Sequence, residues 1–177
     1  MKEVSLDLKE KRVVDKLKIF RDYYNNEVKL SFEDHPFSKE PKHVWVICKH
    51  QGKWLLTKHS ERGLEFPGGK IEIGENAEQA AIREVKEETG GTVESIVYIG
   101  QYIVYGKSDT VIKNVYCANV DQLITQATYY ETDGPQLLER IPRNVRYDGR
   151  YSFVMKDGVL EHCMEYINNQ SISLRPV

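Results

Sequence analysis

Three glutamates recur at helical spacing near the middle of the 177-residue chain. Glu84, Glu87 and Glu88 occupy positions i, i+3 and i+4, so on a helix that turns about 100° per residue they share one face. Like charges at these spacings repel and destabilise an isolated helix. A divalent cation would remove that repulsion, and ligand sets made only of oxygen select hard ions such as Mg²⁺ or Mn²⁺. A charged face turned to solvent is the alternative, and the helix alone leaves the two interpretations balanced.

The residues directly before this helix favour the metal site. Gly68 and Gly69 allow the backbone to approach a ligand closely, and a carbonyl oxygen of this loop can serve as an additional metal ligand. Lys70 follows at a position where its ammonium can meet a phosphate. Two glycines followed by lysine are also found in P-loops, but here position 64 is leucine and Ile71 stands where a P-loop requires Ser or Thr.

The helix that must position the glutamates has clear start and stop signals. Asn76 can cap its N-terminus, and Gln79 three residues later completes a capping-box pattern. Gly90 can adopt the left-handed conformation that ends a helix. Ala81 and Val85 lie on the arc next to the glutamates and can pack against a sheet. The sequence therefore predicts a helix between Asn76 and Gly90.

Apolar residues in alternation predict strands before and after this helix. His43–Cys48 and Trp54–Thr57, separated by Gln51-Gly52, predict a β-hairpin. Residues 65–66 lead into Pro67-Gly68-Gly69, a turn signal that ends a strand. The other predicted strands, rich in Val, Ile and Tyr, are Glu27–Phe32, Thr92–Tyr105 and Val111–Val120.

Two further helices are predicted near the ends of the chain. Apolar residues at helical spacing predict a helix over Leu8–Phe20, with an accessory tail as the alternative, and a C-terminal helix over Glu161–Asn169. Strands and helices in this order indicate an α/β fold, a mixed sheet flanked by helices.

The glycines and the acidic helix together match the pattern G-x5-E-x7-R-E-U-x-E-E-x-G, in which U is apolar. The matching residues are Gly69, Glu75, Arg83, Glu84, Val85, Glu87, Glu88 and Gly90. This pattern resembles the Nudix box, the signature of the Nudix hydrolases. The family usually places an apolar residue after the last glycine, whereas this chain has Gly91, which leaves the geometry of the helix exit open.

The resemblance implies an α/β/α sandwich with a mixed β-sheet and a role for each matching residue. Glu84, Glu87 and Glu88 would bind Mg²⁺, or alternatively Mn²⁺, together with the carbonyl oxygen of Gly68. Arg83 would orient a catalytic glutamate, and Glu75 would support the arrangement of loop and helix. Metal ions that bridge phosphate oxygens lower the pKa of an attacking water, and a nearby carboxylate can then take its proton.

Other residues can complete such a site. Nudix enzymes often bring a further acidic residue to the metals from a loop beyond the box, and Glu131, in the loop 129–135 after the last predicted core strand, is the candidate for metal ligand or general base. Arg62 and Lys70 flank the turn that leads into the box and are candidates for contacting substrate phosphates. All three can alternatively be ordinary solvated charges. His43 and His50 lack metal-ligand spacing and are interpreted as structural.

The resemblance, over roughly residues 20–160, implies a Mg²⁺-dependent hydrolase that cleaves the phosphoanhydride bond of nucleoside 5′-triphosphates, with 8-oxo-dGTP among them. The alternative is an RNA 5′-pyrophosphohydrolase that acts on 5′-triphosphorylated mRNA ends. A non-catalytic module that binds a nucleotide or RNA is a third interpretation, but such modules commonly lose box glutamates, and this chain keeps them.

Composition sets the remaining bounds. Hydrophobic residues make up 40% and charged residues 29% of the chain, as in ordinary globular domains, and a net charge of −2 does not favour non-specific binding to polyanions. No apolar run is long enough to span a membrane. Cys48, Cys117 and Cys163 form no CxxC pair, which is typical of reduced thiols. We therefore expect a cytoplasmic protein without a membrane partner, with an N-terminal extension of unknown role over residues 1–18 and a single domain over residues 19–177.

Overall fold

A computed structural model describes residues 17–170, 172 and 175–177 of the chain. Its helices are α2 (Ala77–Thr89) and α3 (Gly158–Asn169), with short 3-10 turns η1 (Val145–Tyr147) and η2 (Phe153–Met155). Its strands are β1 (Leu17–Arg21), β2 (Glu27–Ser31), β3 (His43–His50), β4 (Lys53–His59), β5 (Gly63–Glu65), β6 (Gly68–Lys70), β7 (Gly91–Tyr105), β8 (Thr110–Leu123), β9 (Thr132–Leu138) and β10 (Arg175–Pro176).

The described strands form one mixed sheet. Seven of them follow the order β1-β2-β7-β8-β3-β4-β5, while β10 pairs with β7, β6 with β3 and β9 with β4. Only β3 and β8 run parallel among these pairs, and the two halves of β3 have different second partners. Residues 43–45 pair with β6 and residues 48–50 pair with β4. β3, the strand next to Gly68 and Gly69, therefore belongs both to the predicted hairpin and to the predicted metal site.

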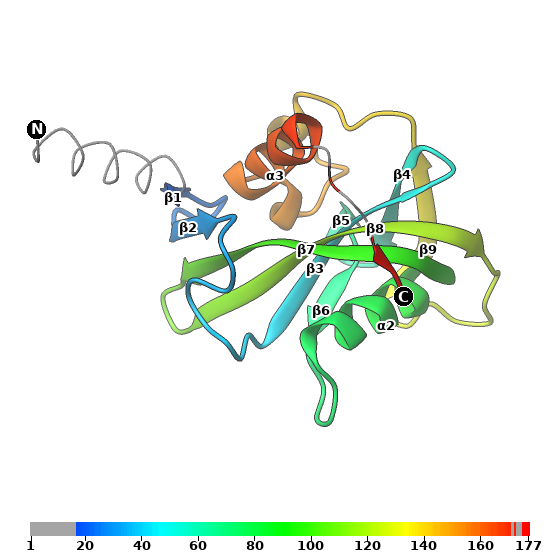
Figure 1. Ribbon diagram of the computed structural model, residues 1–177. Coiled ribbons are helices and arrows are strands. Elements are labelled where there is room, and N and C mark those ends of the chain that lie inside the picture. Colours follow the sequence, from blue (N-terminus) through cyan, green and yellow to red (C-terminus); the bar gives the residue numbers. More distant parts are fainter. Residues whose placement is uncertain (1–16, 171, 173–174) are drawn as a thin grey trace, which may run out of the picture.

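β3 shows why both faces of the sheet are covered. Trp45 and Ile47 pack in the core under α3, whereas Val44, Val46 and Cys48 pack in the core under α2. Successive side chains of a strand point to opposite faces, so each face receives apolar residues. Figure 1 shows α3 and α2 on opposite sides of the sheet. The predicted α/β/α sandwich with a mixed sheet is confirmed.

Several predicted elements have the expected place. The strand 27–32, the hairpin of β3 and β4, the long strands β7 and β8, the box helix α2 and the C-terminal helix α3 are all present, with ends shifted by a few residues. The hairpin turn places Gln51 at φ 50 and Gly52 at φ 78, the left-handed pair that a tight two-residue hairpin requires. Neither α2 nor α3 has the length or hydropathy that crossing a membrane demands.

Two predictions about the elements are wrong, and a third is correct only in part. Residues 17–20 of the predicted helix Leu8–Phe20 lie in β1, which pairs with β2, and the rest of that prediction lies outside the described residues. A strand does end before Pro67, because β5 stops at Glu65, but Gly68 and Gly69 of the predicted turn lie in the short strand β6. The segment 129–135 does not follow the last core strand as a loop, because Thr132–Leu138 forms β9 and pairs with β4.

The exit of α2 explains the departure at Gly91. Gly90 caps the helix at φ 73 and donates its N–H to the Lys86 carbonyl, and β7 begins at the next residue. A Cβ atom on Gly91 would lie 2.8 Å from Thr89 Oγ1 and 2.9 Å from Val120 Cγ1. These contacts leave no room for an apolar side chain, so glycine at this position fits the direct passage from helix to strand.

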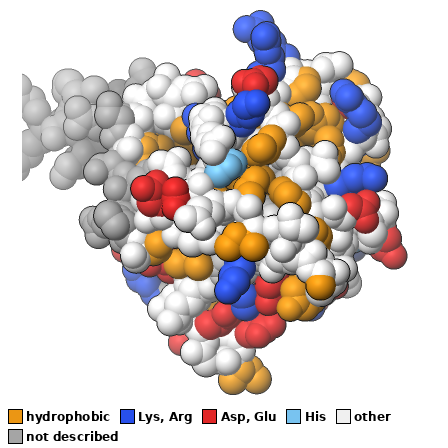
Figure 2. All heavy atoms as spheres, turned by 90° about the vertical axis from the view of Figure 1, so that its right-hand side faces the viewer, with side chains coloured by type: hydrophobic (Ala, Val, Ile, Leu, Met, Phe, Trp, Pro, Cys, Tyr) orange, Lys and Arg blue, Asp and Glu red, His pale blue; other side chains and the backbone are white. Residues whose placement is uncertain are grey.

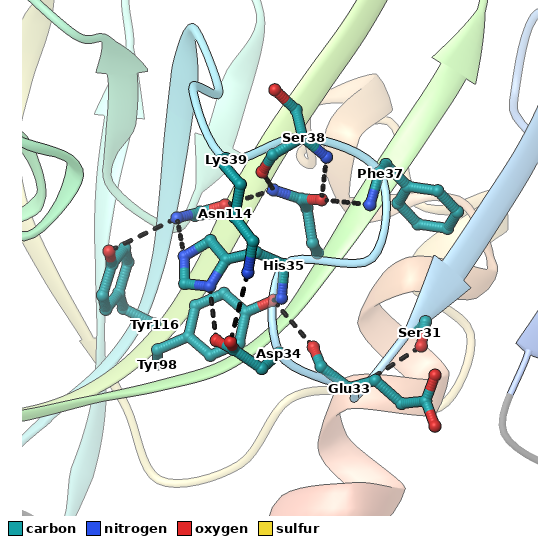
Figure 3. A network of polar contacts seen from close by, with 11 residues as sticks. Ser31, Glu33, Asp34, His35, Phe37, Ser38, Lys39, Tyr98, Asn114 and Tyr116 are labelled. Carbon is teal, nitrogen blue, oxygen red and sulfur yellow. Dashed lines mark hydrogen bonds and ion pairs between the residues drawn. The ribbon is translucent and has the colours of Figure 1, made fainter.

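A network of polar contacts ties the loop 33–42 to the sheet (Figure 3). Gln101, fully buried on β7, accepts the N–H groups of Phe37 and Ser38 at 2.8 and 3.0 Å and donates to the Ser38 carbonyl at 2.9 Å. Its amide also donates to Asn114 Oδ1 at 2.8 Å. The backbone groups of Phe37 and Ser38 thus fix the orientation of the Gln101 amide, and the Gln101 amide in turn fixes that of the Asn114 amide.

His35 completes this network. Because Asn114 Oδ1 accepts from Gln101, its Nδ2 must face His35 Nε2, which lies 3.2 Å away and acts as an acceptor. The imidazole proton is then on Nδ1, 2.5 Å from Asp34 Oδ1, and the ring stacks on Tyr98 at 4.4 Å. The loop that leads into β3 is therefore held by directional contacts.

Replacing Gln101 by Leu tests how strongly this network holds the loop. Removing the amide leaves the N–H groups of Phe37 and Ser38 without acceptors, and we expect a loss of about 3 kcal/mol in the free energy of unfolding, measured by urea titration. The control Gln122→Leu, at an exposed site on β8, should change stability by less than about 0.5 kcal/mol. Equal effects of the two changes would show that the network is dispensable.

Candidate active site

β6 brings glycine backbone directly against the glutamate face of α2. It pairs with the first half of β3, with Gly69 opposite Val44 and Gly68 opposite Trp45. A Cβ atom at Gly69 would overlap the carboxylate of Glu84, and one at Gly68 would lie 2.5 Å from the Val44 carbonyl oxygen. A side chain at Gly68 would collide with the backbone of β3, and one at Gly69 would displace the Glu84 carboxylate, so the two glycines allow this close packing.

Two of the predicted metal ligands are buried at this contact. Glu84 is 9% and Glu88 7% exposed, and the Gly68 N–H donates to Glu88 Oε2 at 3.3 Å. Burial, and after it the carboxylates of Glu84 and Glu65, raise the pKa of Glu88 to about 9. Burial also raises the pKa of Glu84, against the opposing effect of the Arg83 guanidinium. At both carboxylates burial thus has a larger effect on the pKa than the neighbouring arginines.

Arg83 connects the rest of the box through one guanidinium group. Its Nε and Nη2 donate to the Glu75 carboxylate at 3.1 and 2.7 Å, and its Nη1 donates to Glu84 at 2.9 Å and to Glu87 at 3.1 Å. Nη2 also donates to the Lys70 carbonyl at 2.8 Å. The hydrogen bonds from Arg83 lower the pKa of Glu75. Arg83 therefore joins the loop after β6 to the helix that carries the acids.

The donor set fits a hard divalent ion, although it is not arranged around one. Among the described residues, no three acidic, histidine or cysteine side chains stand in a metal-binding arrangement. The reason is visible in the contacts, because Arg83 holds Glu84 and Glu87 while Glu88 turns to the Gly68 N–H. All the predicted ligands supply oxygen, the element that Mg²⁺ and Mn²⁺ prefer. Metal binding would have to draw the carboxylates from these partners.

A cleft of about 560 Å³ opens over the acidic cluster, a volume typical of small-molecule sites. Figure 2 shows acidic side chains gathered low on one face of the molecule, at the height of α2 in Figure 1, with basic side chains beside them. The site residues predicted from the sequence all line this cleft, namely Arg62, Gly68, Lys70, Arg83, Glu84, Glu87, Glu88 and Glu131.

The candidate phosphate and base residues differ in how they are held. Arg62 is engaged with the buried Glu65, at 2.7 Å from Nη2 to Oε1 and 3.2 Å from Nε to Oε2. Lys70 is exposed at the edge of the cleft. The Glu131 side chain is 82% exposed, and its Oε2 lies 3.8 Å from His59 Nε2. Lys70 and Glu131 can thus reach a ligand freely, whereas Arg62 already neutralises a buried carboxylate.

Sequence reasoning missed four residues that line the same cleft. Glu65 is 3% exposed and balanced by Arg62, and the three-residue spacing of this pair was the only available signal. Lys113 lies on β8 beside His43 of β3, and a lysine inside an apolar strand hinted at it. Trp45 offered no signal, and Phe153, an aromatic residue that could stack on a base, is discounted from the sequence because aromatic residues are usually core.

Comparison with known proteins agrees with this geometry. A family model described as "NUDIX domain" matches residues 39–149, and the chain therefore belongs to the Nudix family. It is 57% identical over 141 residues to the Bacillus subtilis (strain 168) protein named "Putative 8-oxo-dGTP diphosphatase YtkD", covering 80% of this chain and 89% of that protein. The crystal structure of the Bacillus subtilis pyrophosphohydrolase BsRppH matches with a TM-score of 0.86 and 52% identity, over 87% of this chain and 98% of that chain. An Escherichia coli (strain K12) 8-oxo-dGTP diphosphatase is 62% identical over 54 residues, 28% of this chain and 42% of that protein.

The burial of Glu88 predicts that Glu88→Gln stabilises the metal-free protein. The pKa of Glu88 is about 9 when folded and near the ordinary glutamate value of 4.5 when unfolded, so the folded protein retains a proton across this range and loses stability as pH rises through it. Glutamine avoids that loss and can still accept the Gly68 N–H. In urea titrations with a chelator, we expect a gain of at least about 1 kcal/mol at pH 8 that shrinks toward pH 5.

The matched control is Glu94→Gln at an exposed site on β7, which should show no such pH dependence. A Glu88→Gln protein that is less stable than wild type at pH 8, or equally stable at both pH values, would contradict the burial argument.

Proposed function

We propose that this chain is a Mg²⁺-dependent hydrolase of nucleoside 5′-triphosphates, 8-oxo-dGTP included, and that Mn²⁺ can replace Mg²⁺. The observation that carries the proposal is the pair of buried carboxylates, Glu84 and Glu88, packed against the glycine backbone of β6 at the floor of the cleft. Buried carboxylates with raised pKa values are typical of functional sites. The names of the relatives, diphosphatase and pyrophosphohydrolase, point to the same chemistry.

In the proposed mechanism each residue has a task that follows from its place. Glu84, Glu87 and Glu88 would hold the divalent ions, with the Gly68 carbonyl as a further oxygen ligand. When bound, these ions neutralise phosphate charge and lower the pKa of a coordinated water. Lys70, exposed at the edge of the cleft, draws the phosphate chain in.

Two further residues have other tasks, since Arg83 positions the acids of the helix and Glu131 accepts a proton. Arg83, bonded to Glu75 on one side and to Glu84 and Glu87 on the other, keeps the helix acids aligned. Glu131 reaches in from the segment before β9 and accepts the proton of the attacking water, or ligates a metal. The new P–O bond to water forms as the anhydride P–O bond breaks, and the leaving phosphate oxygen carries away the electron pair.

The rest of the proposal concerns the setting of the enzyme. Cys48, Cys117 and Cys163 are all free thiols, which supports a cytoplasmic location. We retain residues 19–177 as the catalytic domain and residues 1–18 as an extension. Free nucleotides and RNA 5′ ends share the same scissile bond, and removal of pyrophosphate from 5′-triphosphorylated RNA is the second candidate, supported by a relative named "RNA pyrophosphohydrolase" that is 46% identical over 46 residues.

A substrate panel with the Glu84→Gln variant tests the proposal. Wild-type protein with Mg²⁺ should release pyrophosphate or phosphate from 8-oxo-dGTP, dGTP or 5′-triphosphorylated RNA, compared by kcat/KM at matched concentrations. Glu84→Gln removes a metal ligand and should lower every one of these activities by at least about 10²-fold. No release from any substrate would refute the enzyme, an RNA preference of tenfold or more would reverse the order of the candidates, and one surviving activity would require a second site.

The proposed role of Glu131 predicts a selective loss of turnover. Because its side chain is largely exposed, Glu131→Gln should change the free energy of unfolding by less than about 0.5 kcal/mol, while kcat falls by about 10²-fold or more. Glu61→Gln, at an exposed site in the turn between β4 and β5, is the control and should retain turnover. If Glu131→Gln keeps wild-type kcat, Glu131 takes no part in the reaction.

A further inference from the structure

The end of α2 is bonded to a segment that lies far along the chain. The last carbonyl groups of an α-helix need partners from outside the helix. Here the Gln126 side-chain amide donates to the Lys86 carbonyl oxygen at 2.7 Å and lies 3.3 Å from that of Glu87. The carbonyl of Gly90, which caps the helix, accepts the Ile124 N–H at 3.0 Å. The segment that follows β8 is therefore attached to the turn of α2 that carries the acids.

Two threonine hydroxyls meet at the carbonyl oxygen of Glu88. Thr57 of β4 donates from 3.0 Å, and Thr132, the first residue of β9, donates from 3.1 Å. Both threonines are buried, a setting in which hydrogen bonds are stronger than in water. The Thr132 hydroxyl is equally close to the Tyr129 carbonyl oxygen, at 3.1 Å. Thr132 thus joins the end of the helix to the turn that precedes β9.

Glu131 lies between these attachments. Thr132 follows it directly, and its own carbonyl oxygen accepts both the N–H and the hydroxyl of Ser60 at 3.1 Å. The residue before it, Tyr130, has φ 58, a conformation that residues other than glycine rarely adopt. Such backbone conformations persist only where the surrounding structure determines them, and they cluster at functional sites. The backbone of Glu131 is therefore held on both sides.

The carboxylate of Glu131 has much more freedom than its backbone. It is 82% exposed, and its Oε2 lies 3.8 Å from His59 Nε2. A glutamate side chain in solvent samples many rotamers, so its reach into the cleft depends on where its backbone lies. Because residues 126–132 are tied to the carbonyl oxygens of Glu87 and Glu88, this starting point is fixed relative to the acids of α2.

We propose that Gln126 and Thr132 are positioning residues, which hold Glu131 in place relative to Glu87 and Glu88 through the carbonyl oxygens of the turn that carries these acids. Neither Gln126 nor Thr132 lines the cleft, so both act through Glu131 rather than on the substrate. This inference rests on the proposed function, because it concerns the task of Glu131 in the reaction. It applies whether Glu131 takes the proton of the water or ligates a metal.

Variants of nearly equal volume provide the test. Gln126→Met and Thr132→Val remove the donors, and Thr132→Ser keeps the hydroxyl. With Mg²⁺ and any triphosphate that wild-type protein hydrolyses, Gln126→Met and Thr132→Val should each lower kcat roughly tenfold or more, because displacing a reacting group by about 1 Å is sufficient. KM should stay within about threefold of wild type, and Thr132→Ser should restore kcat to within about threefold. Each variant is measured well below its unfolding temperature.

A double-mutant cycle separates positioning from a general loss of stability. If Thr132 acts through Glu131, Thr132→Val should lower kcat by less than about twofold in the Glu131→Gln background. A weakened fold would lower kcat by the same factor in both backgrounds. The matched controls Thr125→Val and Gln136→Met make the same chemical changes at exposed positions, one on the same segment and one on β9, and should leave kcat as in wild type.

Hydrogen exchange reports the attachment without hydrolysis. In metal-free protein with a chelator, the backbone amides of residues 124–132 should exchange at least about fivefold faster in Gln126→Met and Thr132→Val than in wild type. The two controls should exchange as wild type does. Exchange in Gln126→Met and Thr132→Val as slow as in wild type would show that these bonds do not hold the segment, and would overturn the proposal.

The remaining outcomes separate this proposal from the hydrolase itself. Faster exchange with unchanged kcat, or equal losses of kcat in both backgrounds, would overturn the positioning role and leave the hydrolase standing. Full kcat for Glu131→Gln would do the same, because Glu131 would then have no task to be positioned for. If wild-type protein hydrolyses no triphosphate, the hydrolase is refuted and the positioning role falls with it, whatever the exchange rates show.

Discussion

Burial of two carboxylates against glycine backbone is the constraint on which the rest of this structure depends. Moving charged carboxylates out of water costs several kcal/mol each unless a cation or hydrogen bonds compensate. Glu84 and Glu88 stay there because α2 cannot move away. Ala80, Ala81 and Val85, all 0% exposed, anchor it to the sheet, and both ends of the helix are capped. The stability of this packing holds the site in a state that favours cation binding.

The elements that sequence reasoning predicted correctly are those with local signals. α2 carries its capping box and its glycine stop within the helix and its flanks, so no distant contact is needed to predict it. β6 and β9 contain Gly-Gly and Gly-Pro, which disfavour strands, and they become strands because β3 and β4 offer them partners. At β1, helical spacing of apolar residues was misleading, because pairing with β2 outweighed the local pattern.

In the candidate site, too, the features with local signals could be predicted and the contacts between distant segments could not. The acids of α2 could be predicted because they share one helical face, and every predicted site residue lines one cleft. The partners of the charged groups could not be predicted, since they depend on packing between distant segments. Arg83 bonds Glu75, Glu84 and Glu87 at once, and Arg62 turns to Glu65 rather than standing free. The position of Lys113 inside an apolar strand was a hint, but the cleft that it lines depends on the strands that pack around it.

The register of β8 connects the catalytic cleft to the network around Gln101. Lys113 and Asn114 are successive residues of one strand, so their side chains point to opposite faces. Asn114 is fully buried and bonded to Gln101 and His35, and a slip of one residue would exchange it with Lys113. An ammonium in place of this amide could not accept the hydrogen bond that the Gln101 amide donates, because an ammonium only donates. The polar network on one face of the sheet thus holds Lys113 in the cleft on the other, and the loop that carries this network also contacts the box, because its Lys42 carbonyl accepts the Ile71 N–H.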